Sequence, residues 1–239
     1  MRRALVTGGS GDIGASICRD LARSGHFVYV HAFRNRAAAE SIAREITAAG
    51  GHARAVAFDI TDAIAARAAV ETLLGDGPIQ VLVNNAGIHD DAVFPALRAE
   101  QWHGVIDTSL HGFFNVTQPL MLPMIRSRWG RIVTITSIAA LTGNRGQVNY
   151  AAAKGALHSA TKSLALEVAS RGITVNAVAP GIIATAMSAG YFDAAAIERL
   201  VPMNRAGQPQ EVAGLVAYLT SDAAAYVTGQ VLSINGGMV

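Results

Sequence analysis

The chain of 239 residues contains one cysteine, Cys18, and few charged or aromatic residues. A single cysteine excludes an internal disulfide and a zinc site built from several cysteines, and it suits a reducing compartment. Charged residues make up 15% of the chain and the net charge is +2, with no lysine- or arginine-rich run, so nothing favours nucleic acid as a partner. The seven histidines show no paired spacing typical of metal ligands, and no stretch reaches the roughly 18 uninterrupted apolar residues of a membrane span. We expect a soluble cytoplasmic protein without a bound metal.

Hydrophobic residues make up 51% of the chain, in short apolar runs that alternate with helical patterns. The apolar runs predict strands at residues 4–6, 27–32, 53–58, 81–83, 131–136, 174–178 and 230–234. The helical patterns predict helices at residues 12–24, 37–49, 63–74, 102–127, 148–169 and 210–220, and residues 182–208 are irregular with room for one short helix. Strands that alternate with helices predict crossover connections between parallel strands. We therefore expect one α/β domain over residues 1–239, a doubly wound parallel sheet with helices on both faces.

Glycines, asparagines and other unusual residues follow the predicted strands. In a doubly wound sheet, ligands bind beyond the carboxyl ends of the strands, where the strand order reverses. The residues at these ends are Gly8–Gly14, Asp59, Asn84–Gly87, Ser137 and Pro180–Gly181. The sequence therefore predicts a ligand site at this edge of the sheet.

The segment S-I-A-A-L-T-G-N-R-G-Q-V-N-Y-A-A-A-K, residues 137–154, joins a strand end to a helix. Tyr150 and Lys154 are four residues apart on that helix, so their side chains share one face. At about 4 Å and an effective dielectric near 20, the ammonium would stabilise a phenolate by roughly 4 kcal/mol, which is about three pKa units. We expect the pKa of Tyr150 to be lowered toward neutrality, so that the phenol exchanges a proton with a substrate whose oxygen Ser137 holds. The same spacing occurs by chance on many helices, so its meaning depends on the other strand ends.

The segment T-G-G-S-G-D-I-G follows the first strand and opens the first helix. Glycines in such a turn let the backbone approach a pyrophosphate, and the helix N-terminus adds free N–H groups and positive potential. A purely structural turn is the alternative. Asp12 would repel phosphates, so we expect it to cap the helix and point away. The residues expected to bind a dinucleotide here are Gly8, Ser10, Gly11, Asp12, Ile13 and Gly14.

The end of the second strand lacks the acidic residue that holds the ribose 2′-hydroxyl in NAD enzymes. The segment from His31 to Arg36 contains no Asp or Glu and two arginines, Arg34 and Arg36. An arginine at this place can bind a 2′-phosphate. We therefore expect NADPH (NADP) to be favoured over NADH, with Arg34 as its ligand, unless both arginines are ordinary solvated charges.

The remaining strand ends supply further candidates for cofactor binding. Asp59 can accept from an adenine amino group with Ile60 packed on the ring, or it can cap the next helix. Asn84–Gly87 can line the cofactor or form a purely structural turn. After Pro180–Gly181, residues 182–205 lie where a lid over a nicotinamide is expected, with Thr185 on its carboxamide. The candidates are Asp59, Ile60, Asn85, Ala86, Gly87, Pro180, Gly181, Ile183 and Thr185, together with Tyr150 and Lys154.

Taken together, the T-G-x-x-x-x-x-G turn, N-N-A-G, a serine thirteen residues before Y-x-x-x-K, and P-G resemble the short-chain dehydrogenase/reductase family over essentially the whole chain. The ending Y-V-T-G-Q-V-L-S-I-N-G-G-M is similar to that of 3-oxoacyl-[acyl-carrier-protein] reductases of fatty-acid, polyketide or aryl-polyene pathways. The resemblance implies a Rossmann-like fold and a substrate carried as a thioester by acyl carrier protein or coenzyme A. It also implies a homotetramer, with a heteromer containing a related subunit as the alternative.

Residue by residue, the resemblance implies that Tyr150 is the general acid in reduction and that Ser137 holds the carbonyl. It implies that Lys154 modulates the pKa of the tyrosine and binds the ribose. Arg128 and Arg171 fall where relatives have basic residues that dock the acidic carrier, and solubilising surface charge is the alternative for both.

The sequence departs from the family pattern at two places. D-I-G replaces G-[IL]-G in the glycine turn, so Gly11 is displaced by one position. D-T-S-L-H-G places Ser109 where the family has a catalytic asparagine that anchors a water behind the lysine, and Asn115 is too far along the chain to replace it. A serine hydroxyl can also bind a water, so we expect Ser109 to give a working but altered proton relay.

Three functions remain open from the sequence. The first is NADPH-dependent reduction of a 3-oxoacyl thioester to the 3-hydroxyacyl thioester. The second is a dehydrogenase or reductase of another small alcohol or ketone. The third is a catalytically weak, nucleotide-binding partner subunit, which Ser109 favours and the intact Ser137, Tyr150 and Lys154 oppose.

Overall fold

Seven parallel strands form one sheet in the order β3-β2-β1-β4-β5-β6-β7 in a computed structural model, which describes residues 1–239. Every predicted strand is present, with small shifts at the ends. The strand order reverses at β1, which pairs in parallel register with β2 on one side and with β4 on the other, so the doubly wound sheet is confirmed. The strands are β1 (Arg3–Val6), β2 (Phe27–Ala32), β3 (His52–Ala57), β4 (Ile79–Asn84), β5 (Gly130–Ile135), β6 (Ile173–Pro180) and β7 (Val231–Ile234).

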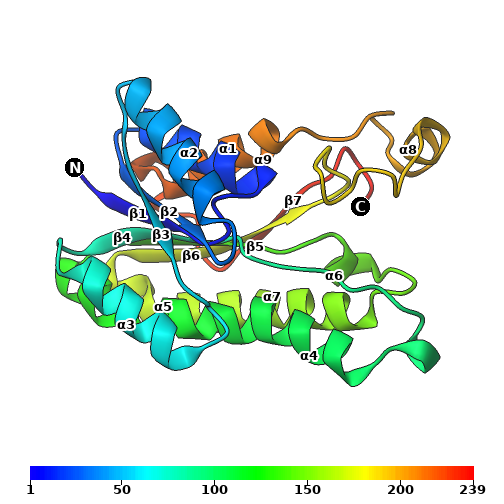
Figure 1. Ribbon diagram of the computed structural model, residues 1–239, viewed down its shortest axis with the longest axis horizontal. Coiled ribbons are helices and arrows are strands. Elements are labelled where there is room, and N and C mark those ends of the chain that lie inside the picture. The colour runs from blue at the N-terminus through cyan, green and yellow to red at the C-terminus, as the bar shows by residue number, and fades with distance from the viewer.

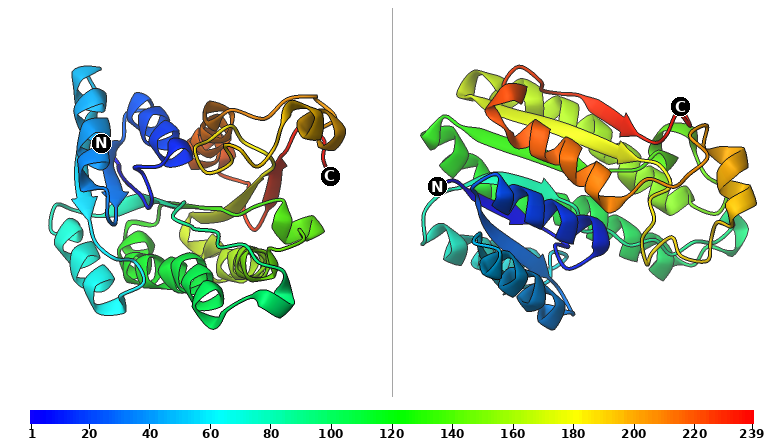
Figure 2. Two further views of the ribbon diagram at one scale, coloured as in Figure 1. Left: turned by 45° about the vertical axis from the view of Figure 1, so that its right-hand side comes forward. Right: turned by 90° about the horizontal axis from the view of Figure 1, so that it is seen from above.

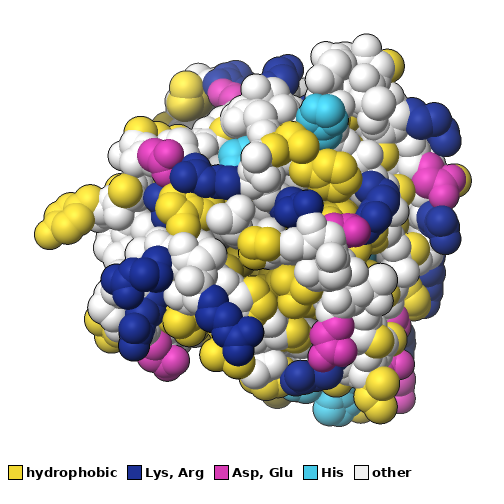
Figure 3. Space-filling model, turned by 90° about the vertical axis from the view of Figure 1, so that its left-hand side faces the viewer, with side chains coloured by type: hydrophobic (Ala, Val, Ile, Leu, Met, Phe, Trp, Pro, Cys, Tyr) yellow, Lys and Arg dark blue, Asp and Glu magenta, His cyan; other side chains and the backbone are white.

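Helices cover both faces of the sheet (Figures 1 and 2). One face carries α1 (Asp12–Arg23), α2 (Arg36–Ala48) and α9 (Pro209–Thr220). The other carries α3 (Ala63–Leu74), α4 (Ala99–Ile106), α5 (Gly112–Ser127) and α7 (Val148–Val168). The short helices α6 (Ala139–Thr142) and α8 (Ala194–Leu200) lie beyond the carboxyl ends of the strands, at the right of Figure 1, and 3-10 turns occur at Phe94–Ala96, Ala169–Arg171 and Asp222–Ala224. None of the helices has the length and hydropathy needed to span a membrane.

The helix predicted at 102–127 is not a single α-helix. It begins as α4, widens into a π-helical turn at Asp107–His111, and continues as α5. A π-turn adds one residue to a helical turn and re-aims the side chains around it, and such turns are frequent at functional sites. This one carries Ser109, which is buried.

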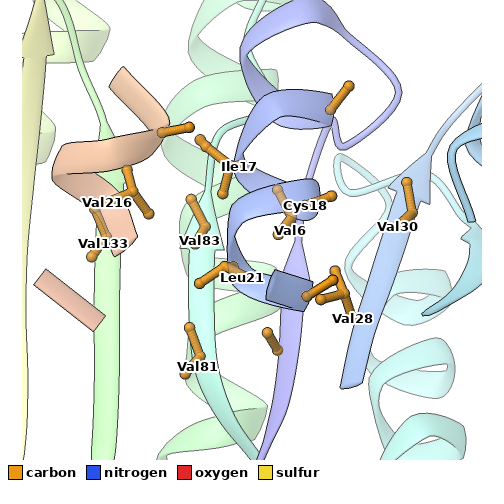
Figure 4. Packing of buried hydrophobic residues seen from close by; sticks show 14 of the residues in the cluster. Val6, Ile17, Cys18, Leu21, Val28, Val30, Val81, Val83, Val133 and Val216 are labelled. Atoms are coloured by element: carbon orange, nitrogen blue, oxygen red, sulfur yellow. The ribbon is translucent and has the colours of Figure 1, made fainter. Parts of the chain in front are cut away.

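The core beneath the glycine turn is built from α1 and the central strands (Figure 4). Ile17, Cys18 and Leu21 lie on one stripe of α1 and pack against valines such as Val6 and Val83, and all five are fully buried. Burial raises the pKa of the Cys18 thiol, which keeps it protonated and unreactive. This packing fixes the start of α1 over the carboxyl end of β1, where the glycine turn lies.

Candidate active site

The glycine turn between β1 and α1 is held by the neighbouring Asn84–Gly87 turn. The Asn85 side-chain amide donates to the carbonyl oxygens of Thr7 and Gly8, at 3.0 Å each. The Thr7 hydroxyl oxygen accepts from the backbone N–H groups of Asn85 (3.0 Å) and Ala86 (3.1 Å). Gly8 has φ +61°, and a β-carbon on Gly14 would overlap the carbonyl oxygen of Gly8. The two turns therefore form one rigid unit, and only glycine fits at both positions.

Several backbone N–H groups of this turn have no hydrogen-bond partner in the chain. Gly11 donates to the carbonyl of Gly8 (3.1 Å), but the N–H groups of Ser10, Asp12 and Ile13 have no acceptor in the chain. Helix α1 begins after Gly11 with no side-chain cap. Uncapped N–H groups at a helix start are an anion site. The turn thus fits the pyrophosphate of a dinucleotide.

Asp12 does not cap α1, contrary to expectation, because Gly11 occupies the cap position. The Asp12 carboxylate instead accepts a hydrogen bond from the backbone N–H of Ala186, at 2.7 Å. In the same segment, the Thr185 hydroxyl lies 3.2 Å from the Ser188 hydroxyl, which organises a local turn. The contact therefore ties the glycine turn to residues 182–192, where a lid was predicted.

The two arginines after β2 differ in their partners. The Arg36 guanidinium pairs with the Glu40 carboxylate one helical turn later, at 2.8 Å. Arg34 is exposed, lies 5.3 Å from the centre of the Phe33 ring and has no carboxylate partner. Arg34 is therefore the one available for a phosphate.

Asp59 and Ile60, at the end of β3, are positioned differently from the prediction. The Asp59 carboxylate accepts from the Thr61 backbone N–H (2.8 Å) and hydroxyl (2.7 Å), and Asp62 caps α3, so the helix-cap interpretation of Asp59 is wrong. The Ile60 side chain is 6% exposed and packs in the core, where Gly112 leaves room for it. An adenine ring therefore cannot stack on the Ile60 side chain as predicted, although Asp59 remains at the sheet edge.

Pro180, Gly181 and Ile183 support the end of β6. The Pro180 carbonyl accepts from the N–H of Ile138, and the Gly181 N–H donates to the carbonyl of Ile234, at 2.9 Å each. A β-carbon on Gly181 would lie 2.9 Å from the Cα of Asn235. Ile183 is 5% exposed and packs in the core. These contacts set the direction in which residues 184–192 leave the sheet.

Ser137, Tyr150 and Lys154 come together beyond the carboxyl end of β5. Ser137 follows β5, and Tyr150 and Lys154 lie on one face of α7. The Ser137 side chain lies close enough to the Tyr150 phenol to lower its pKa, and the Ser137 hydroxyl oxygen accepts from the backbone N–H of Ala139, at 3.2 Å. The Lys154 Nζ lies 5.7 Å from the centre of the Tyr150 ring and donates to the carbonyl of Ile135, at 2.9 Å.

The pKa of Tyr150 is raised, not lowered as the sequence predicted. Burial of the phenol is the main cause, the negative charge of Asp91 adds to it, and the interaction with the Ser137 side chain opposes both. Lys154 is 3% exposed, and burial lowers its own pKa to about 8. The prediction considered only the attraction between phenolate and ammonium, and desolvation of the phenol outweighs it.

Ser109 and Lys154 face the same point beside Gly87. A β-carbon on Gly87 would lie 3.0 Å from the Lys154 Nζ and 3.9 Å from the Ser109 hydroxyl oxygen. Ser109 is 4% exposed, and its hydroxyl has no hydrogen-bond partner. Asn115 donates instead to the carbonyl of Ile60 (2.9 Å), on another turn of the helix. An unpartnered buried hydroxyl therefore lies next to the lysine.

Arg128 and Arg171 lie next to each other at the opposite edge of the sheet. They precede β5 and β6, and Arg128 donates to the carbonyl of Ser170, at 3.4 Å. Strands of six residues separate the two edges by about 20 Å. Figure 3 shows this face, where several Lys and Arg side chains gather with fewer acidic ones among them. Within one chain, these arginines are therefore remote from Tyr150.

A cavity of about 790 Å³ borders the glycine turn but contains none of Ser137, Tyr150 and Lys154. It lies between α1, residues 182–192 and the start of α9. This cavity meets the candidate active site only at residues 10–12. No three His, Cys, Asp or Glu side chains converge as metal ligands.

One supporting residue was missed from the sequence. Asn149 is fully buried, and its side-chain amide donates to the carbonyls of Asp90 and Gln101.

A family model described as enoyl-(acyl carrier protein) reductase matches residues 9–239. The chain belongs to the short-chain dehydrogenase/reductase family. It is 44% identical to a 3-oxoacyl-[acyl-carrier-protein] reductase of Aggregatibacter actinomycetemcomitans, over 98% of both chains. It is also 44% identical to a 3-oxoacyl-[acyl-carrier-protein] reductase of a Synechocystis species, over 99% of this chain and 96% of the relative. It is 42% identical to an acetoacetyl-CoA reductase of an Acinetobacter species, over 98% of this chain and 96% of the relative. This short-chain reductase is therefore an NAD(P)-dependent oxidoreductase.

Proposed function

We propose that this enzyme reduces a 3-oxoacyl thioester to the 3-hydroxyacyl thioester with NADPH. The observation that carries the proposal is the convergence of Ser137 and Tyr150 beyond the end of β5, with Lys154 buried beside them. Two hydroxyls at one point can both donate to a carbonyl oxygen. The relatives named above, a 3-oxoacyl-[acyl-carrier-protein] reductase and an acetoacetyl-CoA reductase, support a thioester as the substrate.

Tyr150 is the proposed general acid, and its raised pKa means that it holds its proton until negative charge develops on the substrate oxygen. Bound NADPH supplies the hydride that adds to the carbonyl carbon. Ser137 and Tyr150 hold the carbonyl oxygen, and the phenol gives up its proton as negative charge develops there. Because burial keeps the phenol protonated in the resting enzyme, the proton is in place before the hydride arrives.

Lys154 and Ser109 are proposed to return the proton to Tyr150. A pKa of about 8 lets the lysine exchange a proton near neutral pH with little cost in free energy. The Ser109 hydroxyl faces the same point beside Gly87 and has no partner in the chain. It can therefore anchor a water on the path from Lys154 to solvent.

NADPH is proposed over NADH because of Arg34. Its exposed guanidinium has no carboxylate partner, whereas Glu40 neutralises Arg36. No Asp or Glu lies between His31 and Arg36 to repel a 2′-phosphate. The free amides of Ser10 and Ile13 would take the pyrophosphate, and Asp59 would take the adenine.

We also propose that the enzyme is a homotetramer. Phe114 and Leu122 on α5 are 62% and 63% exposed, and Leu166 on α7 is 85% exposed, so the outer faces of these helices are apolar. Arg128 and Arg171 lie at the edge of the sheet away from Tyr150, so they can dock an acidic carrier only for the active site of another subunit. A native mass that contains a second, different chain would favour the heteromer.

The test is turnover against a panel of substrates with NADPH. We expect acetoacetyl-CoA and longer 3-oxoacyl thioesters, free and carrier-bound, to be reduced faster than simple ketones. Tyr150→Phe should lower kcat at least about 100-fold, with the NADPH dissociation constant unchanged. Faster reduction of ketones without a thioester would favour the second function, and NADPH binding without turnover on any ketone would favour a non-catalytic subunit.

A further inference from the structure

His31 is a buried titratable residue that the proposed reaction does not use. It lies near the end of β2 and is 2% exposed. Its Nδ1 accepts a hydrogen bond from the backbone N–H of Gly8 (3.1 Å), and its Nε2 lies 2.9 Å from the carbonyl oxygen of Phe58. A donor at one nitrogen and a carbonyl at the other fix a neutral imidazole protonated on Nε2. The ring thus joins the turn after β1 to the end of β3.

Gly8 is the residue on which the geometry of the glycine turn depends. Its N–H is held by His31, and its carbonyl oxygen accepts from Asn85 (3.0 Å) and from the N–H of Gly11 (3.1 Å). The peptide groups on both sides of Gly8 are therefore fixed, at a φ of +61°. The direction of the free N–H groups that follow depends on these two peptide planes.

We propose that His31 is a positioning residue for the cofactor pyrophosphate. By holding the peptide before Gly8, it directs the free amides of Ser10 and Ile13 toward one point. The inference rests on the proposed cofactor site. Burial lowers the pKa of His31 to about 4, so the ring remains a neutral acceptor at neutral pH. The alternative is a purely structural link between strands, supported by ring contact with Phe58 at 4.3 Å between centroids.

Three substitutions separate the two hydrogen bonds of His31. Asn carries its amide oxygen at the position of Nδ1, so His31→Asn keeps the Gly8 bond and loses the Phe58 bond. Gln carries its amide nitrogen at the position of Nε2, so His31→Gln keeps the Phe58 bond. His31→Leu removes both. His26→Leu is the matched control, because His26 precedes the other end of β2, is 8% exposed and bonds only the carbonyl of Leu21.

The dissociation constants of NADPH and of adenosine 2′-phosphate, which lacks the pyrophosphate, are measured by calorimetry alongside thermal unfolding. We expect His31→Leu and His31→Gln to weaken NADPH binding about tenfold, which corresponds to about 1.4 kcal/mol. His31→Asn should bind nearly as wild type, and adenosine 2′-phosphate should bind all variants equally. His26→Leu should lower the unfolding temperature without changing either dissociation constant.

Two results would overturn the inference. One is unchanged NADPH affinity in His31→Leu. The other is that Asn and Gln weaken NADPH binding equally, in proportion to their loss of thermal stability, which would make His31 a structural link only. If His31→Leu does not fold, the Asn and Gln pair still decides the question. Wild-type protein that binds neither NADPH nor NADH would overturn the proposed function together with the inference, whereas normal wild-type binding with unaffected variants overturns the inference alone.

Discussion

Replacing Ser109 with alanine should raise stability and lower turnover. The Ser109 hydroxyl is buried and has no hydrogen-bond partner. An unsatisfied buried polar group costs about 1–3 kcal/mol, and alanine is also the better helix former. Part of this gain is offset by the small void left by the oxygen. The chain offers this hydroxyl no partner and one bound water would satisfy it only in part, so we expect Ser109→Ala to raise the free energy of unfolding by up to about 1 kcal/mol and the Tm by up to about 2–4 °C for a chain of this size.

The loss of turnover follows from the position of the hydroxyl beside Lys154. If it anchors a water on the proton path, Ser109→Ala should lower kcat about tenfold or more with the NADPH dissociation constant unchanged. Urea unfolding and steady-state kinetics measure the two effects. Thr161→Val is the matched control, because it removes another fully buried, unpartnered hydroxyl further along α7 and should leave kcat unchanged.

Two outcomes would refute this reasoning. A fall in the free energy of unfolding of more than about 1 kcal/mol would mean that the hydrogen bonds of the Ser109 hydroxyl are fully satisfied in the folded protein. An unchanged kcat would mean that the proton path does not pass Ser109. A rise in kcat for Ser109→Asn would show that serine limits the native relay.

Three further predictions concern the cofactor site. Arg34→Ala should weaken the affinity for NADPH about tenfold or more and leave the affinity for NADH unchanged, whereas Arg36→Ala should change neither affinity. Equal effects of Arg34→Ala on both nucleotides in steady-state assays would contradict the assignment. Asp12→Asn keeps an acceptor for the Ala186 N–H but removes a negative charge, so NADPH should bind severalfold more tightly in titrations at low salt, and a gain that persists at high salt would not be electrostatic. The pKa of His31 is about 4 in the folded chain and 6.5 ordinarily, so the unfolded chain takes up the proton first as the pH falls. Roughly 3 kcal/mol of stability should therefore be lost between pH 6.5 and pH 4. Urea unfolding of His31→Leu at the same pH values should lack this loss.

Apolar runs, and the glycines that follow them, were sufficient to predict the strands and their carboxyl ends. Strands buried on both faces read as near-continuous apolar runs, and β6 (Ile173–Pro180) is buried at every position. The glycine turn was equally readable, because Gly8 and Gly14 are required by a positive φ and by a close backbone approach. The π-turn at Asp107–His111 was not, since it consists of residues that also occur in ordinary helices.

The errors at the site come from properties that spacing along the chain does not contain. Asp12 was assigned to its own helix, but its partner Ala186 is 174 residues away. Ile60 was assigned to a ligand, but Gly112 opens a place for it in the core. The pKa of Tyr150 was argued from the neighbouring charge alone, and its direction depends on burial, which only the folded chain provides. Pairwise spacing thus predicts which groups meet, whereas tertiary packing decides their protonation.

The environment of Ser109 bears on whether this chain is a catalyst or a non-catalytic subunit. A subunit without a reaction to perform gains nothing from a buried hydroxyl that lacks a partner, and alanine at that position would be more stable by about 1 kcal/mol. Violations of local rules at a small number of positions are typical of functional sites. Here the violation lies beside Lys154, the residue whose pKa burial lowers to about 8. The serine is therefore better explained as a working part of the proton path than as the mark of a lost activity.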